Sequence, residues 1–518
     1  MSTTPQEPSE SFWLPLFVIV TGAFAAILSS SSVNVAIPKL MAIFGVSSND
    51  VQWVLTGYML SSAIVIPLSG YLGDRFGNKK VFIYSLGLFT LGSVFCSFAW
   101  SNQSLIVFRV LQGLGGGIIM PISMAIIYRI VPLNQIGLAL GVWGMAAIMG
   151  PAIGPTLGGY ILEHFNWRLL FLINIPVGLL GIFLSIFLLK ETPVKEQTKF
   201  DSWGFLLSTL GCFALLLALS QGSKEGWSSY YIVMLFLISF FALLLFVLHE
   251  LSCEEPLLDL RLLKNSTFSI SVLVGGLINI GLFGGVFLTP LFTQNLMNMS
   301  AYDTGLLLLP ASLVTGLMMP ISGVLFDKFG AKMISFVGLT ILAVGTLEMQ
   351  HLTADTGKME LIIILSIRSF GMGLAMMPIS TAGMNVVAKQ LVGQASALSN
   401  VIRQIFASFG IAVLTTIMQN RQIFHTARLS DGISSFAPGV ALHLKQLQVA
   451  LINSVGSESA SGVALSYVWG VLQKQALVFA IDDTFFISAL FIFVAIPLVF
   501  FIKEKNPLDK RKAASQEG

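Results

Sequence analysis

Charged residues are scarce in this chain. Asp, Glu, Lys and Arg make up 10% of its 518 residues, and hydrophobic residues make up 55%. A soluble protein carries about a quarter charged residues, so a soluble globular fold is excluded and lipid is the expected solvent. The net charge of +3 is too small to favour nucleic acid as a partner.

Cysteine and histidine are scarce as well. The three cysteines, Cys96, Cys212 and Cys253, lie far apart and form no disulfide framework or metal-ligand spacing. The five histidines fall near the ends of apolar runs or in loops, so we expect no metal site and no bound cofactor. The first eleven residues contain no Lys or Arg, which predicts a retained first span rather than a secretory signal.

What the chain has instead is fourteen apolar runs, each near the roughly 20 residues that a membrane helix needs. They predict an all-α integral membrane protein with fourteen transmembrane helices. The second run covers Val51–Leu72 and the last covers Ala476–Ile502. The expected organisation is a tail (1–12), a six-helix half (13–190), two inserted helices (200–249), a second six-helix half (266–502) with a long loop (420–475), and a tail (503–518).

Basic residues predict the orientation. Seventeen Lys and Arg fall on one side of the predicted spans and eight on the other. The side with more basic residues is normally cytoplasmic. We therefore expect both termini in the cytoplasm and the loop 420–475 outside. Its segment ALHLKQLQVALINSV is amphipathic at helical spacing and is expected to lie on the outer face or to be a packed connector.

One charged motif occurs twice. SGYLGDRFGNKK (Ser69–Lys80, the first copy) closes the second span, and SGVLFDKFGAKM (Ser322–Met333, the second copy) closes the tenth. The fourth and twelfth spans open on a second related pair, FRVLQGLGGGIIMPIS and IRSFGMGLAMMPIS. Both matches are eight spans apart. Repeats of this kind are typical of transporters built from two parallel halves, here with two extra helices between them.

These motifs carry a family resemblance. GYLGDRFGNKK, LIVFRVLQGLGGG and GPAIGPTLGG (Gly150–Gly159), with VNVAIP and WRLLFLINIPVG, resemble the major facilitator superfamily and its fourteen-helix drug:proton antiporters. The resemblance implies the major facilitator fold, no enzymatic activity, and export of small amphiphilic compounds driven by the proton gradient. It implies a bacterial inner membrane protein, with a periplasmic adaptor and an outer-membrane channel as candidate partners.

The resemblance also assigns roles to residues. It implies a conformational lock formed by Gly70, Asp74, Arg75, Gly77, Lys79, Lys80, Asp327 and Lys328. It implies a gate helix with Gly150, Pro151, Gly154, Pro155, Gly158 and Gly159. A carboxylate such as Asp74 can face a helix N-terminus, closely spaced glycines allow helices to approach, and prolines kink a span. The alternatives are a solvated turn and simple small-residue packing.

Three arginines fall within the predicted spans: Arg109, Arg368 and Arg403. A charge at this depth is costly, so each should face a cavity or a partner. The resemblance gives Arg109 a part in proton coupling. The alternative is that such an arginine binds helix carbonyls and braces the bundle.

Acids are missing from the middle of every predicted span. The family commonly has an acid in its first span, where this chain reads LSSSSVNVAIP with Ser29 at that position. The proton carrier, if protons drive export, is therefore sought among Glu163, Asp482 and Asp483. Two adjacent carboxylates disfavour double ionisation. The lack of a deep acid favours neutral or anionic substrates over dications.

The substrate cavity should lie at mid-depth between the halves. Candidate lining residues are Asn34, Trp53, Tyr58, Gln112, Trp143, Asn279, Arg368, Asn400, Arg403 and Gln404. Each could equally pack between helices. Three functions stay open: a multidrug exporter, an exporter of an anionic or fatty-acid-like metabolite, and a receptor or scaffold that transports nothing.

Overall fold

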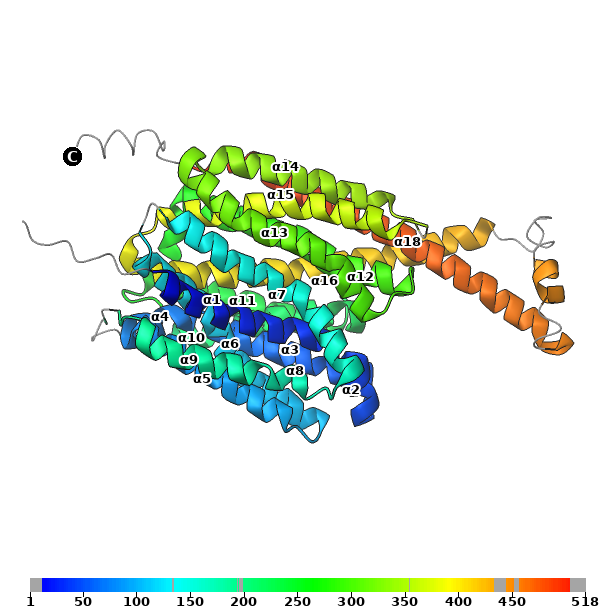
Figure 1. Cartoon of the computed structure of the whole chain (residues 1–518), viewed down its shortest axis with the longest axis horizontal. Helices are drawn as coiled ribbons and strands as arrows, with labels where there is room; N and C mark the ends of the chain where they lie inside the picture. The colour runs from blue at the N-terminus through cyan, green and yellow to red at the C-terminus, as the bar shows by residue number, and fades with distance from the viewer. Residues whose placement is uncertain are drawn as a thin grey trace, which may run out of the picture.

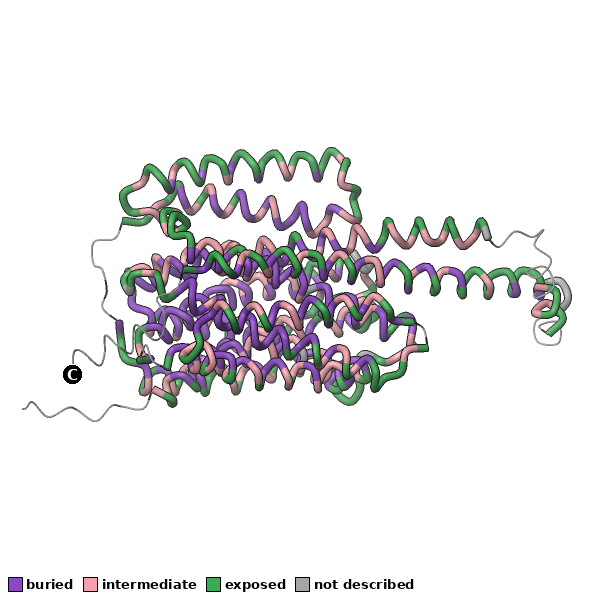
Figure 2. The backbone as a smooth tube through the Cα atoms, turned by 90° about the horizontal axis from the view of Figure 1, so that it is seen from above, coloured by how far each residue is buried: buried purple, intermediate pink, exposed green. Residues whose placement is uncertain are grey.

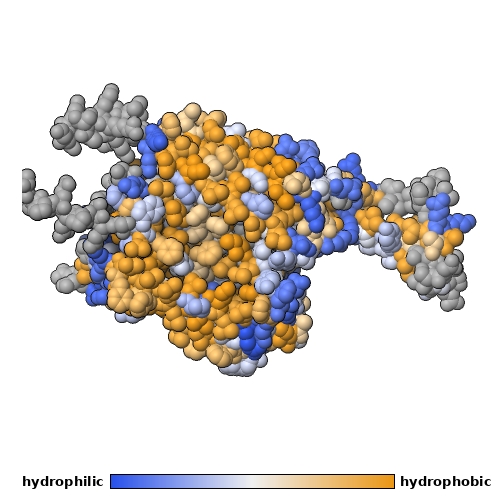
Figure 3. All heavy atoms as spheres, viewed as in Figure 1, coloured by the Kyte–Doolittle hydropathy of each residue, from blue (hydrophilic) through white to orange (hydrophobic). Residues whose placement is uncertain are grey.

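The computed structural model describes residues 12–132, 135–192, 194, 199–353, 355–432, 444–450 and 456–503. Within these ranges thirteen helices are long and apolar enough to cross a membrane, or fourteen when one bent pair counts as a single span. They lie side by side in one bundle (Figure 1). Apolar residues cover its middle and hydrophilic ones gather at its ends (Figure 3), which confirms the expected all-α membrane fold. The expected tails lie outside the described residues, except for Phe12 and Lys503.

Helices α1 to α9 form the first half of the bundle. Within this half, the helices that pack most extensively on each other are α5 with α6, α3 with α6, and α1 with α7. The helices are α1 (Trp13–Asn34), α2 (Ile37–Phe44), α3 (Ser48–Val65), α4 (Leu68–Phe76), α5 (Asn78–Ser97), α6 (Asn102–Ile130), α7 (Ile136–His164), α8 (Leu169–Leu172) and α9 (Asn174–Leu188).

Two inserted helices follow, α10 (Ser202–Glu225) and α11 (Tyr230–Ser252), which pack on each other. Only 22% of the most apolar stretch of α11 is buried, as expected for a helix that faces lipid. The second half contains η1 (Leu260–Lys264), α12 (Ser266–Asn295), α13 (Ala301–Phe329), α14 (Ala331–Glu348), η2 (Met349–His351), α15 (Lys358–Asn385), η3 (Lys389–Leu391), α16 (Val392–Gly432) and α18 (Ser457–Val499). The halves meet along α7 and α13.

The predicted span over Val51–Leu72 is bent and not a single straight helix. It is two helices, α3 and α4, bent by 53° around Pro67. Proline has no N–H and its ring clashes with the preceding turn, so a helix breaks there. The matching Pro320 of the second copy lies inside the continuous α13. The repeat in sequence is therefore not a repeat in local geometry.

The segment 420–475, expected as a long loop, is largely helical in its described residues. Helix α16 has 41 residues and α18 has 43, about 60 Å each at 1.5 Å per residue, twice the roughly 30 Å hydrocarbon core. Both project well beyond the bundle (Figures 1 and 2). Within the amphipathic segment, 444–450 is helical, and Gln448 Nε2 donates to Ser461 Oγ at 3.2 Å; 433–443 and 451–455 lie outside the described residues.

Candidate functional site

The first copy of the charged motif places a carboxylate inside the bundle. Asp74 is buried near the end of α4, and its Oδ1 lies 3.9 Å from Nη2 of Arg129 at the end of α6. In sequence, Arg129 is only one of the seventeen basic residues that predict the cytoplasmic side. The sequence does not predict this pairing, because the two residues lie on different helices.

In both copies the helix ends at a glycine with positive φ, Gly77 at +89° and Gly330 at +80°. A side chain is strained at these angles, which explains why both copies have glycine there. After Gly77 the chain binds the end of α9, because Lys79 Nζ donates to the carbonyl of Ile186 at 2.6 Å. A cation suits the exposed carbonyls of a helix C-terminus. Lys80 and Lys328 are exposed, and Arg75 is half-buried.

Each copy docks on the start of a helix in the opposite half. A Cβ on Gly70 would lie 3.2 Å from Cα of Gln394, near the start of α16. A Cβ on Gly137, near the start of α7, would lie 3.0 Å from Oδ1 of Asp327. Gly323 packs on the Gly137 backbone. The partial positive charge of a helix N-terminus favours the nearby carboxylate. We call these two contacts the joints; they join the halves at one end of the bundle.

Arg109 is fully buried in the first half. Its Nε donates to the carbonyl of Val54 at 3.2 Å, and its Nη1 donates to Oε1 of Gln112 at 2.7 Å. The guanidinium also lies 4.2 Å from the ring centre of Tyr58, a cation–π distance. Nη2 has no hydrogen-bond partner among the described atoms, so this buried cation is only partly satisfied.

Gln112 links Arg109 to the position of the missing acid. Its Nε2 donates to Ser29 Oγ at 3.2 Å and to Ser93 Oγ at 2.6 Å. We call Ser29, Ser93, Arg109 and Gln112 the arginine network. The sequence analysis named Ser29 and Arg109 separately, and no sequence signal joined them.

The other two membrane arginines have different surroundings. Arg368 is buried within the second half, where Nε donates to Thr346 Oγ1 at 3.1 Å and Nη2 to the carbonyl of Gly281 at 2.6 Å. It therefore braces α12, α14 and α15 in this conformation. Arg403 is half-buried and lines a cavity of about 30 Å³ together with Ser271.

The remaining cavity candidates are scattered. Tyr58, Gln112, Trp143 and Asn279 are buried, and they offer little surface in this conformation. Asn279 and Asn400 donate to carbonyls of their own helices. Asn400 and Gln404 are half-buried, whereas Asn34 and Trp53 are exposed. The arginine network and its cation–π contact connect Tyr58 with Gln112.

The structure also contains a cavity, larger than the one beside Arg403, that the sequence does not predict. It has a volume of about 670 Å³, lies between α10, α11 and α16, and is lined by Leu215, Leu219, Trp227, Phe236, Phe406 and Phe409 among others. Trp227 Nε1 donates to Thr416 Oγ1 at 3.0 Å beside it. Its size is that of a drug-binding pocket. In sequence these aromatics look like ordinary lipid-facing residues.

The predicted gate helix α7 runs unbroken past both of its prolines. Pro155 cannot donate to the carbonyl of Pro151, and Ser31 Oγ of α1 donates to that oxygen at 3.1 Å instead. Gly154 and Gly158 pack on α1, as does Gly150, and Gly159 packs on Tyr302 of α13. The helix thus presents small residues to both halves.

The acid candidates are of three kinds. Glu163 is exposed near the end of α7. Asp483 Oδ2 accepts from Arg421 Nε at 2.6 Å and lies 2.7 Å from His425 Nε2. Asp482 is half-buried, and its buried Oδ1 has no partner among the described atoms. Because α18 starts at Ser457, both aspartates lie about halfway along this helix.

Comparison with known proteins agrees with this architecture. The sequence model of the Major Facilitator Superfamily matches residues 19–411. The uncharacterized MFS-type transporter YhcA of Bacillus subtilis (strain 168) is 37% identical over 517 residues, which cover 99% of this chain and 97% of YhcA. The multidrug transporter protein MdtP of the same organism is 30% identical, with 96% and 94% covered.

More distant similarities extend over nearly the whole chain. The multidrug export protein EmrB of Escherichia coli (strain K12) is 29% identical, with 96% of this chain and 97% of EmrB covered. Among solved structures, the proton:xylose symporter XylE superposes with a TM-score of 0.59 at 14% identity, covering 95% of this chain and 97% of that chain. This protein therefore belongs to the Major Facilitator Superfamily, as a multi-pass membrane transporter and not an enzyme.

Proposed function

We propose that the protein exports small amphiphilic compounds by alternating access, coupled to proton entry across the bacterial cell membrane. Both termini and the two joints would face the cytoplasm, which the excess of Lys and Arg at that end supports. A periplasmic adaptor and an outer-membrane channel are candidate partners. No cofactor is required, because the proton gradient supplies the energy.

The pair of joints is the observation that supports alternating access best. Each joint is small: in the first, Gly70 packs on Gln394, and in the second, Gly323 packs on Gly137 with Asp327 beside the start of α7. Contacts of this kind stabilise one arrangement by only about 0.3–1 kcal/mol per charge. They can therefore break and reform during a transport cycle, whereas the packed interior of each half moves as a unit.

The amphiphilic substrate class is supported by the cavity between α10, α11 and α16. Its wall is apolar and aromatic, with Trp227, Phe236 and Phe406 among the lining residues. A compound dissolved in the membrane could reach such a wall without leaving lipid. MdtP and EmrB are named as multidrug proteins, which favours the same class.

A second candidate is export of an anionic or fatty-acid-like compound. Arg109 Nη2 is buried and has no acceptor in the described part of the chain, and a substrate carboxylate could satisfy it. A receptor that transports nothing would bind compounds without moving them. Uptake into inverted membrane vesicles, with and without a pH gradient, separates a transporter from a receptor: accumulation driven by the gradient supports the transporter, and binding without accumulation supports the receptor.

Neutralising Asp74, in the first copy of the motif, should slow transport. We expect Asp74→Asn to reduce vesicle transport several-fold, within the range of conformational coupling energies, because it removes the charge that Arg129 faces while keeping the shape. Expression should be normal. Asp303→Asn, at the start of α13, is the matched control and should transport normally. Wild-type rates in Asp74→Asn would mean that this charge only sets topology.

Neutralising Asp482 should uncouple transport from protons. We expect Asp482→Asn to lose gradient-driven accumulation in vesicles, because a half-buried carboxylate without a partner is suited to bind and release a proton. Glu163→Gln is the control, since Glu163 is exposed at a helix end. Full gradient-driven accumulation by Asp482→Asn would exclude this residue as the carrier.

A further inference from the structure

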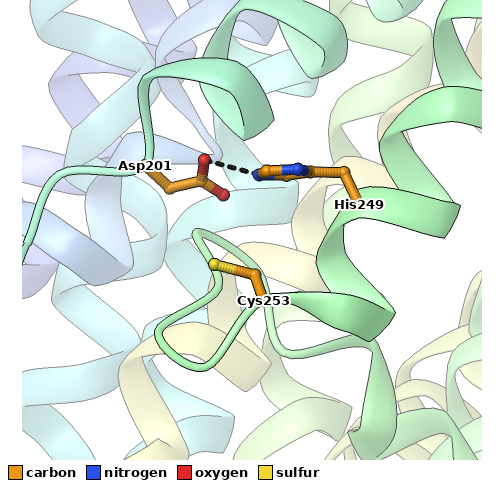
Figure 4. Close-up of side chains that lie close together, drawn as sticks. All are labelled: Asp201, His249 and Cys253. Carbon is orange, nitrogen blue, oxygen red and sulfur yellow. Dashed lines mark hydrogen bonds and ion pairs between the residues drawn. The ribbon is translucent and has the colours of Figure 1, made fainter.

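The inserted helices bring together a set of side chains that the transport cycle does not use. Asp201 immediately precedes α10, while His249 and Cys253 lie one turn apart at the end of α11 (Figure 4). One ligand atom from each of the three lies within 4.8 Å of the others. The spacing of 48 residues between Asp201 and His249 hides this cluster from a motif search.

The cluster holds two carboxylate oxygens that lack a partner. Asp201 Oδ1 accepts from the N–H of Gly204 at 2.8 Å and lies 2.8 Å from His249 Nε2. Its Oδ2 and Oε1 of Glu250 have no hydrogen-bond partner among the described atoms. A Cβ placed on Gly204 would clash with both of these oxygens, so they face the same point. Glu250 is fully buried, and 7% of the Asp201 side chain is exposed.

Two buried carboxylates that face each other need a positive partner. A charge that leaves water without compensation costs several kcal/mol. The His249 ring supplies compensation on the side of Asp201 Oδ1 only, when it is protonated. A cation among the four side chains would satisfy both orphan oxygens at once.

We propose that Asp201, His249 and Cys253, with Glu250 as a fourth ligand, form a binding site for a divalent transition metal, best matched by Zn²⁺. Thiolate, imidazole and carboxylate together suit Zn²⁺, whereas Ca²⁺ and Mg²⁺ prefer oxygen alone. Zinc–ligand bonds of about 2.0–2.3 Å place tetrahedral ligands roughly 3.3–3.8 Å apart. The ligand atoms of Asp201, His249 and Cys253 lie within 4.8 Å of one another, so these three need only small side-chain movements. Glu250 Oε1 would join them from the side of Asp201 Oδ2, since both oxygens face Gly204.

The location suggests that a bound metal would hold the start of α10 and the end of α11 together. Glu250 Oε2 accepts from the N–H of Leu258 at 3.4 Å, and Glu255 Oε2 accepts from the N–H of Lys199 at 2.8 Å. These bonds tie together the chain segments that enter α10 and leave α11. A metal bound here would fix both ends of the inserted pair, between the segments that lead to the two halves. The site does not depend on which compound is transported.

The test is direct metal binding by the purified full-length protein in detergent. Co²⁺ serves as the probe, because a Cys253 thiolate on Co²⁺ gives a near-ultraviolet charge-transfer band, and Zn²⁺ should then displace it. We expect one ion per chain and a higher Tm with Zn²⁺, since binding to the folded state stabilises it. Cys253→Ser should abolish the band, and His249→Ala should weaken binding roughly tenfold or more.

Cys212→Ser is the matched control, because Cys212 is a buried free thiol in α10 outside the cluster. It should keep both the band and the affinity. The same band in Cys253→Ser, equal affinity in the His249→Ala variant, or no Co²⁺ or Zn²⁺ binding by the wild type would overturn the proposal. In that last case His249 and a proton on Glu250 would neutralise the cluster. None of these outcomes bears on the transport proposal, which has its own assay.

Discussion

Replacing Arg109 with glutamine is expected to reduce transport by roughly 100-fold, the upper part of the range for conformational coupling, while leaving the protein folded. No carboxylate among the described residues pairs with Arg109, so removing its charge relieves roughly 2.5–3.5 kcal/mol of insertion cost. The variant loses two charged hydrogen bonds, worth about 1.5–3 kcal/mol each. These terms largely offset each other, so Tm should change little.

The measurement is vesicle transport together with thermal unfolding in detergent. Arg368→Gln is the matched control, because Arg368 is also buried but donates to Thr346 and Gly281 of its own half. We expect this control to keep most of its transport. A loss of transport in Arg109→Gln that is accompanied by unfolding would make Arg109 a structural brace. An equal loss in both variants would mean that any buried charge in these helices matters alike.

Introducing an acid at Ser29 is expected to change the substrate charge that the protein accepts. Ser29 is buried, and its hydroxyl accepts a hydrogen bond from Gln112 Nε2. The Oε1 atom of the same Gln112 side chain accepts from Arg109. An aspartate there would be compensated by this network and would add a deep negative charge. We expect Ser29→Asp to improve competition by a permanent dication roughly tenfold or more, because uncompensated charge costs several kcal/mol at such depth.

The assay is competition between matched amphiphiles of charge −1, 0, +1 and +2 in vesicles. Ser29→Asn is the neutral control, with nearly the same size and no charge, and it should show no gain. If the wild type already binds the dication best, another group replaces the missing acid. If Ser29→Asp and Ser29→Asn behave alike, the network does not contact the substrate.

The sequence by itself determined the class of fold. Fourteen apolar runs with so few charges can satisfy their backbone in lipid only as helices, and the two copies of the charged motif already indicate two related halves. The glycine at which the helix of each copy ends is explained by local backbone geometry, because Gly77 and Gly330 both have positive φ. These properties depend on neighbours within a few residues, so they can be read along the chain.

Local signals failed where a helix end depends on its surroundings. Pro67 and Pro320 occupy matching positions, yet only Pro67 breaks its helix. The length of α16 and α18 was also missed, because 420–475 is too polar to resemble a span, although most of its described residues continue these two helices. Hydropathy predicts where lipid lies, and it does not predict where a helix stops.

Only the tertiary structure decided which polar groups meet. Ser29 and Gln112 are 83 residues apart, and Asp201 and His249 are 48 apart. Each pair is joined by the packing of separate helices, which backbone contacts at small residues such as Gly113 and Gly211 permit. A buried polar side chain must find its partner wherever the fold brings one, and that partner has no fixed distance along the chain.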